Sequence, residues 1–194
     1  MIFRRKYEFK PDRPQSGDLG KLYVTKKQRL TFLKWGLLAL TMLVASLLQD
    51  VIMSRFSIFG TTTDLISCAI IIACIMQDPE TGCVFGLVSS VLYYFSGTSP
   101  GAYVIGLLTG LGVVISIFRQ CYLRRGFGSI LVCTAMGLLI YELTVFLIGA
   151  FLGTIPWRHY EKFCITAGLS LTAVPVLYPI ILSIGKIGGE LWKE

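Results

Sequence analysis

Beyond Lys34 the chain consists of long apolar runs separated by short polar connections. Of its 194 residues, 54% are hydrophobic and 15% are charged, and the mean hydropathy is +0.70. An ordinary soluble domain carries about 25% charged residues, so this chain has too few charges to cover a surface exposed to water. The pattern predicts an all-α, multi-pass membrane protein whose spanning domain covers residues 32–185.

Six apolar segments can be separated, and each predicts one transmembrane helix of a compact bundle. Their approximate bounds are 32–48, 64–77, 80–95, 102–118, 129–152 and 163–184. The second segment is short, since "LISCAIIIACIM" has twelve apolar residues where a spanning helix needs about 20. The connection "QDPETG" after it offers Asp78 as a helix cap and Pro79 as a first helical residue, which predicts a helical hairpin over 64–95. Pro175 and Pro179 are expected to kink the last segment.

The distribution of Lys and Arg indicates the orientation of these segments. The first 34 residues hold ten of the eighteen Lys and Arg. With six spans and a cytoplasmic N-terminus, fifteen of these residues fall on the cytoplasmic side and three outside. If the second segment were re-entrant, the distribution would weaken to ten against eight. Six spans with both termini cytoplasmic are therefore predicted.

The charged ends of the chain are predicted to lie in the cytoplasm. Residues 1–31 form a basic, polar N-terminal tail, and residues 186–194 form a short C-terminal segment. The +7 formal charge therefore reflects topology, and no nucleic-acid partner is expected. A sharper alternative is that the tail docks on anionic lipid or on a cytoplasmic partner. The basic residues available for such docking are Arg4, Arg5, Lys6, Lys26, Lys27 and Arg29.

Catalytic and metal-binding patterns are scarce. The single histidine, His159, lies in the polar "PWRHYEKF" connection, which argues against a His-containing metal motif or Ser/His dyad within the membrane. The six cysteines show no CxxC or Cys/His spacing and are interpreted as free thiols in apolar surroundings. We therefore expect no enzyme activity, no metal and no cofactor.

Glu142 is the one ionisable residue in the middle of an apolar segment, and such residues are functional candidates. At helical spacing it shares a stripe with Gly149 and Gly153, which predicts a close contact inside the bundle or at a subunit interface. Two interpretations stay open. Glu142 is either a structural carboxylate satisfied by a hydroxyl of a neighbouring helix, or a polar anchor for a partner helix or small ligand.

Further candidates lie at helix ends and at small residues. Asp64, after three threonines, is expected to cap the second segment. Tyr93 and Tyr94 end the third segment and are candidates for a binding surface. Two glycine pairs with spacing of four are expected to pack helices closely. These pairs are Gly82/Gly86 and Gly106/Gly110.

Residues 47–101 carry a pattern that resembles the MreD family of rod-shape-determining membrane proteins. The family pattern is a first span ending in Leu-Gln, a "sIfG…pDL" loop, a short apolar helix, a Gly/Pro turn and a closing Ser-Gly loop. The matching positions are Leu48–Gln49, Ser57–Gly60, Asp64–Leu65, Pro79, Gly82, Gly86, Ser96–Gly97 and Gly101. The chain departs from the pattern at Thr63, where the family has Pro, and at Tyr93 or Tyr94, where the family has an acidic residue.

The resemblance implies a non-catalytic scaffold in the bacterial inner membrane, part of the cell-elongation complex that builds peptidoglycan in rod-shaped bacteria. Its direct partner would be MreC, bound through transmembrane helix contacts, with indirect links to MreB, RodA and a class B transpeptidase. The fold implied is a six-helix bundle similar to the substrate-binding components of energy-coupling-factor transporters. The alternative function is such a vitamin-binding component, with an outward pocket near Asp64 and Tyr93–Tyr94.

Overall fold

The computed structural model describes residues 26–55, 60–122 and 126–187. Most of the predicted basic tail, including Arg4, Arg5 and Lys6, lies outside these residues, as does the C-terminal segment from residue 188. The first helix begins at Lys26, six residues earlier than the predicted start of the membrane domain. The described part of the chain is all-helical and contains no strand, which confirms the predicted all-α class.

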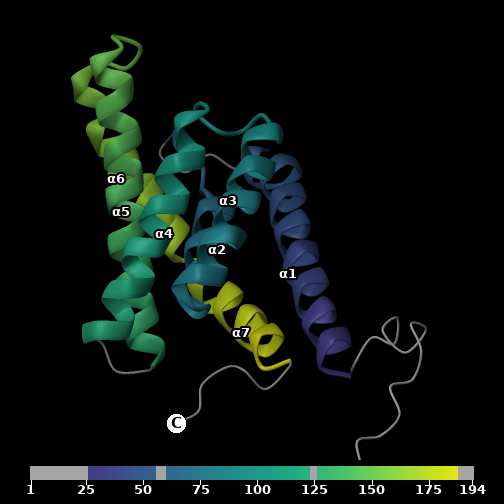
Figure 1. Ribbon diagram of the computed structural model, residues 1–194. Helices are drawn as coiled ribbons and strands as arrows, with labels where there is room; N and C mark the ends of the chain where they lie inside the picture. The colour runs from purple at the N-terminus through teal and green to yellow at the C-terminus, as the bar shows by residue number, and fades with distance from the viewer. Residues whose placement is uncertain (1–25, 56–59, 123–125, 188–194) are drawn as a thin grey trace, which may run out of the picture.

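The helices follow one another with short connections (Figure 1). In chain order the α-helices are α1 (Lys26–Val51), α2 (Leu65–Met76), α3 (Pro79–Phe95), α4 (Tyr103–Tyr122), α5 (Phe127–Phe151), α6 (Tyr160–Leu171) and α7 (Val174–Gly185). Two 3₁₀ turns, η2 (Met53–Arg55) and η3 (Trp157–His159), follow α1 and precede α6.

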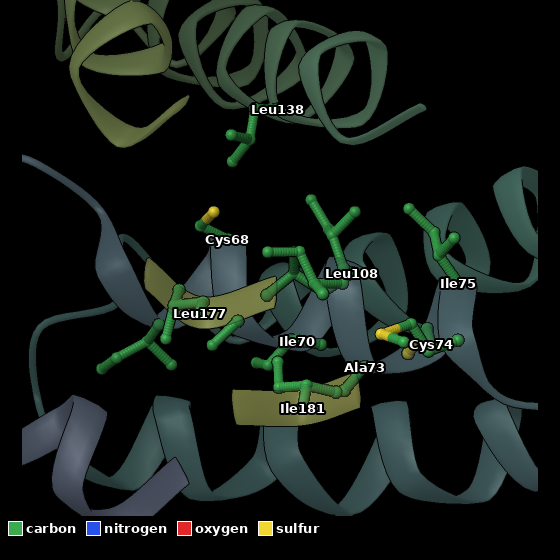
Figure 2. Close-up of a cluster of buried hydrophobic side chains, with 14 of the residues drawn as sticks. Cys68, Ile70, Ala73, Cys74, Ile75, Leu108, Leu138, Leu177 and Ile181 are labelled. Carbon is green, nitrogen blue, oxygen red and sulfur yellow. The ribbon is translucent and has the colours of Figure 1, made fainter. Parts of the chain in front are cut away.

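Helix α2 lies in the middle of the bundle, and α1, α3, α4, α5 and α7 pack around it (Figure 1). From Ile66 to Met76 every residue of α2 is buried. Figure 2 shows the apolar contacts of this core, with Leu108 of α4, Leu138 of α5 and both Leu177 and Ile181 of α7 around α2. The uniform apolar composition of this segment is explained by neighbours on all sides.

The carboxyl end of α2 is satisfied by side chains of α4. The Arg119 guanidinium donates a hydrogen bond to the carbonyl of Ile75, and the Ser116 hydroxyl donates to that of Gln77 at 3.3 Å. Helix ends leave carbonyls without partners inside the helix, and here α4 supplies the donors. The sequence placed Arg119 in a polar connection, but α4 extends to Tyr122 and Arg119 is buried.

Three helices of the described residues are long and apolar enough to cross a membrane, namely α1, α4 and α5. The pair α6 and α7 adds a fourth crossing if it is counted as one bent span. Only 17% of the apolar window of α1 is buried, against 50% of that of α5. The side of α1 that faces away from the bundle is thus apolar and exposed, as expected for a helix in contact with lipid or with another membrane helix.

The predicted last segment divides into two helices that meet at an angle of 49°. Pro175 stands in the first turn of α7 and has no N–H to donate to the carbonyl four residues earlier. The amides of Thr172 and Ala173 instead make short turns to residues three positions back. The expected bend is therefore present, but it lies just before Pro175, and Pro179 remains inside α7.

The two glycine pairs predicted to pack helices differ in the structure. A Cβ added to Gly86 would lie 2.9 Å from the sulfur of Cys74, and one added to Gly82 would lie 3.1 Å from the Cys74 carbonyl oxygen. On the other side, a Cβ at Gly112 would lie 3.0 Å from the same sulfur. The expected close crossing is absent at Gly106 and Gly110, where an added Cβ would meet nothing within 4 Å.

This difference gives a test of α2–α3 packing. We expect Gly86→Ala to lower the free energy of unfolding by about 1–3 kcal/mol, because the Cys74 sulfur is held between Gly86 and Gly112 and cannot move aside. Gly110→Ala, the matched control, should stay within about 1 kcal/mol of wild type. The measurement is thermal or denaturant unfolding of purified protein in detergent.

The double variant Gly86→Ala with Cys74→Ala identifies the cause. Removing the sulfur opens the space that the new methyl group needs, so the double variant should unfold at a higher temperature than Gly86→Ala in the Cys74 background. Simple addition of the two single effects would contradict the packing explanation.

Candidate binding sites

Asp64 organises the amino end of α2. Its side chain accepts hydrogen bonds from the Ser67 amide at 3.1 Å, from the Ser67 hydroxyl at 2.5 Å and from the Tyr93 hydroxyl at 3.0 Å. Its own amide donates to the Ser170 hydroxyl at 2.8 Å. The predicted cap is therefore present, and this one buried residue connects α2 with α3 and α6.

Gln49 supplies a second partner for the start of α2. Its side-chain oxygen accepts a hydrogen bond from the Ile66 amide at 2.9 Å, so α1 also contributes to this cap. Asp78, the other predicted cap, stands at the expected position before α3 but makes no side-chain hydrogen bond there. The amide of Gly82 bonds to the backbone carbonyl of Asp78 instead.

A cavity of about 380 Å³ lies beside Asp64, at the end of the bundle where α1, α3 and α5 finish. Four of the six predicted interface candidates line it, namely Asp64, Tyr93, Glu142 and Gly149. Tyr93, Glu142 and Gly149 are 29, 78 and 85 positions from Asp64 in the sequence, and they share one site because the helices alternate in direction. The size of the cavity is within the range of about 300–1,000 Å³ that is usual for small-molecule sites.

The other two interface candidates lie elsewhere. Tyr94 is exposed on the outside of α3, with its ring edge toward Phe95. Gly153 follows α5 with φ +70°, a left-handed conformation that glycine adopts without strain, so its role is to end the helix. The predicted stripe of Glu142, Gly149 and Gly153 therefore ends before Gly153.

Glu142 faces the cavity from the middle of α5. Its side chain is 6% exposed, and among the described residues none donates a hydrogen bond to its carboxylate. Among the described residues no neighbouring hydroxyl bonds to Glu142, so whether it is a structural carboxylate or a polar anchor stays a prediction. The hydroxyl groups of Tyr93, Tyr141 and Ser67 belong to a network around Asp64 instead.

Several residues of the cavity wall were missed by the sequence analysis. Tyr103, Tyr141 and Phe163 bring aromatic rings to it, and Gln49 adds an amide. Tyr141 directly precedes Glu142 and could have been suspected from that neighbourhood. Tyr103 and Phe163 stand at the starts of α4 and α6, and their sequence surroundings carry no signal of a shared site.

An apolar groove of about 950 Å³ runs between α1 and α7 on the outside of the bundle. Its walls include Leu40, Val44, Val176 and Ile180, while Ala45 is buried at its base. Thr63 borders both this groove and the cavity beside Asp64. The chain thus offers two different surfaces, one polar at a bundle end and one apolar along two helices.

The described residues contain no group of three or more His, Cys, Asp or Glu that could hold a metal ion. The cysteines in these residues are free thiols. Of the described residues that line the cavity, none is Lys, Arg or His. The chemistry on offer in the cavity is hydrogen bonding, aromatic contact and two carboxylates.

The cap at Asp64 can be tested against the one at Asp78. We expect Asp64→Ala to lower the free energy of unfolding by about 2 kcal/mol or more, since it removes an N-cap and leaves buried donors of Ser67 and Tyr93 without a partner. Asp78→Ala should change it by less than about 0.5 kcal/mol, because Asp78 is exposed and makes no such bond. Equal effects in unfolding experiments would contradict the assigned role.

Comparison of the chain with protein-family models, with curated proteins and with solved structures finds no match.

Proposed function

We propose that the chain is a non-catalytic membrane scaffold of the bacterial cell-elongation complex and binds the transmembrane helix of MreC. The observation that carries this proposal is the apolar groove between α1 and α7. MreB, RodA and a class B transpeptidase would be reached indirectly, through MreC. The resemblance of residues 47–101 to the MreD family provides the identity of the partner.

The shape of the groove suits a helix. The stretch of α1 that lines it, from Leu37 to Leu48, is about 18 Å long at 1.5 Å per residue, and so is the stretch from Ala173, just before α7, to Ile184. Small residues lie along it, with Thr41 and Ala45 on α1 and Ser183 on α7. Small side chains let helix backbones approach closely in a membrane, where dispersion contacts drive association.

Six spans in the inner membrane remain our interpretation of the topology. The start of α1 and the end of α7 lie at the same end of the bundle in Figure 1, as an even number of crossings requires. Helix α3, with 17 residues, and the buried α2, with 12, would complete the six with α6 and α7 as one bent span. The excess of Lys and Arg in the predicted cytoplasmic segments supports cytoplasmic termini.

A specific observation also favours the second candidate, a substrate-binding component of an energy-coupling-factor type vitamin transporter. The cavity beside Asp64 and Tyr93 has the size and the mixed lining of a small-molecule site. This candidate predicts co-purification with a pair of ATPases, whereas the scaffold predicts co-purification with MreC. Isolation of the tagged protein from native membranes distinguishes the two.

The groove is tested by filling it. We expect Val176→Trp, on α7, to reduce the amount of MreC that co-purifies at least tenfold, because the indole would occupy the space of the partner helix. Val114→Trp is the matched control, since Val114 is exposed to the same degree on α4, away from the groove. MreC is quantified against equal amounts of each variant.

The outcomes separate the alternatives. Normal MreC binding by Val176→Trp would contradict the groove as its binding site. Absence of MreC from the wild-type preparation, with ATPases present instead, would support the transporter component. Glu142→Gln should leave MreC binding unchanged, since Glu142 faces the cavity and does not line the groove.

A further inference from the structure

The carboxylate of Glu142 poses a physical problem that the scaffold function does not solve. Burial of an ionised group without a partner is strongly unfavourable, and even a neutral carboxyl needs its hydrogen bonds. Glu142 is 6% exposed, and none of the described residues donates a hydrogen bond to it. Its side chain faces a cavity, so a bound molecule can supply what the protein does not.

The remaining polar groups of the cavity indicate which charge this molecule carries. Asp64 also lines the cavity, but both of its oxygens already accept hydrogen bonds from Ser67 and Tyr93. Of the described lining residues, none is basic. Two acidic side chains with no basic residue among the described lining favour a positively charged ligand, and Glu142 is the one whose oxygens remain available.

The aromatic walls narrow the choice further. Tyr93, Tyr103, Tyr141 and Phe163 all line the same cavity. Rings around a cation favour an organic ammonium group, which binds to aromatic faces through cation–π interactions. A divalent metal ion would need about six or more oxygen ligands, or several retained waters. One available carboxylate supplies too few of these ligands.

We propose that this cavity binds an organic ammonium cation, with Glu142 as its counter-charge and the four aromatic rings as its walls. This inference goes beyond the scaffold function and does not rest on it. The ammonium group can belong to a free small molecule or to a lipid headgroup. The second source is consistent with an apolar groove of about 150 Å³ between α5 and α6, which Glu142 and Phe163 also border and which has room for a short part of an acyl chain.

The test uses choline as the probe and 3,3-dimethyl-1-butanol, which has the same shape without the charge, as its control. The full chain is purified in detergent, and its thermal unfolding and calorimetric binding are measured with each compound. We expect a saturable rise of the unfolding temperature with choline and none with the uncharged analogue. An equal saturable rise with both compounds would overturn the proposal.

Variants of the cavity residues test whether choline binds at this site. Glu142→Gln should weaken choline binding at least tenfold, while Glu161→Gln, an exposed acid at the start of α6, should bind as wild type does. Tyr103→Leu should weaken binding several-fold and Tyr103→Phe should not, since only the first removes the ring. These two variants keep the test valid if Glu142→Gln fails to fold. Unchanged binding by folded Glu142→Gln, or by Tyr103→Leu, would overturn the assignment.

A lipid arm distinguishes the source of the ammonium group. Native mass spectrometry of wild type and Glu142→Gln is done after incubation with phosphatidylcholine or, as the anionic control, phosphatidylglycerol. Retention of phosphatidylcholine by wild type but not by Glu142→Gln supports a headgroup ligand, and a response to free choline alone supports a soluble one. The proposal is overturned if wild type binds neither choline nor phosphatidylcholine. Val176→Trp, which fills the groove and not the cavity, should bind choline and phosphatidylcholine as wild type does. A negative result for the cavity therefore leaves the proposed MreC binding untouched, and the reverse also holds.

Discussion

The bundle depends on one constraint, which is that a short helix buried on all sides must have both of its ends satisfied by other helices. Apolar packing alone would restrict movement of α2 perpendicular to its axis, but it would leave the terminal amides and carbonyls of the helix without partners. Asp64 and Gln49 satisfy the amino end, and Arg119 and Ser116 satisfy the carboxyl end. These side chains fix how far α2 sits along α1, α3 and α4, which dispersion contacts between apolar surfaces specify only weakly.

The same constraint explains why polar groups collect at one end of an apolar protein. The residues that cap α2 at its amino end also form part of the cavity wall, because Asp64, Tyr93 and Gln49 serve both purposes. Glu142 is different, since it takes no part in the cap and no described residue donates a hydrogen bond to it. A capped helix end therefore accounts for most of the polarity of this site, and Glu142 is the part that the cap does not explain.

Features that depend on residues adjacent in the sequence could be predicted. Features that depend on how helices distant in the sequence pack together could not. Asp64 could be identified as a cap because its position before an apolar run is a local signal. Glu142 stood out because a carboxylate is costly inside an apolar segment. By contrast, Gly82/Gly86 and Gly106/Gly110 have the same spacing, yet only the first pair faces Cys74. Tyr103 and Phe163 join the cavity through the packing of α4 and α6, which no local pattern records.

The cavity and the groove are separated by a single short segment. Thr63 borders both, Asp64 lines the cavity and Leu65 lines the groove, while the Thr63 hydroxyl is buried without a hydrogen-bond partner. A partner helix that displaces Leu65 or Thr63 would act directly on the backbone of the Asp64 cap. Any resulting effect on ligand affinity must be matched by an equal effect of the ligand on partner affinity, because linkage between two binding equilibria is reciprocal. This wall is a direct physical route by which occupancy of the cavity can influence binding in the groove.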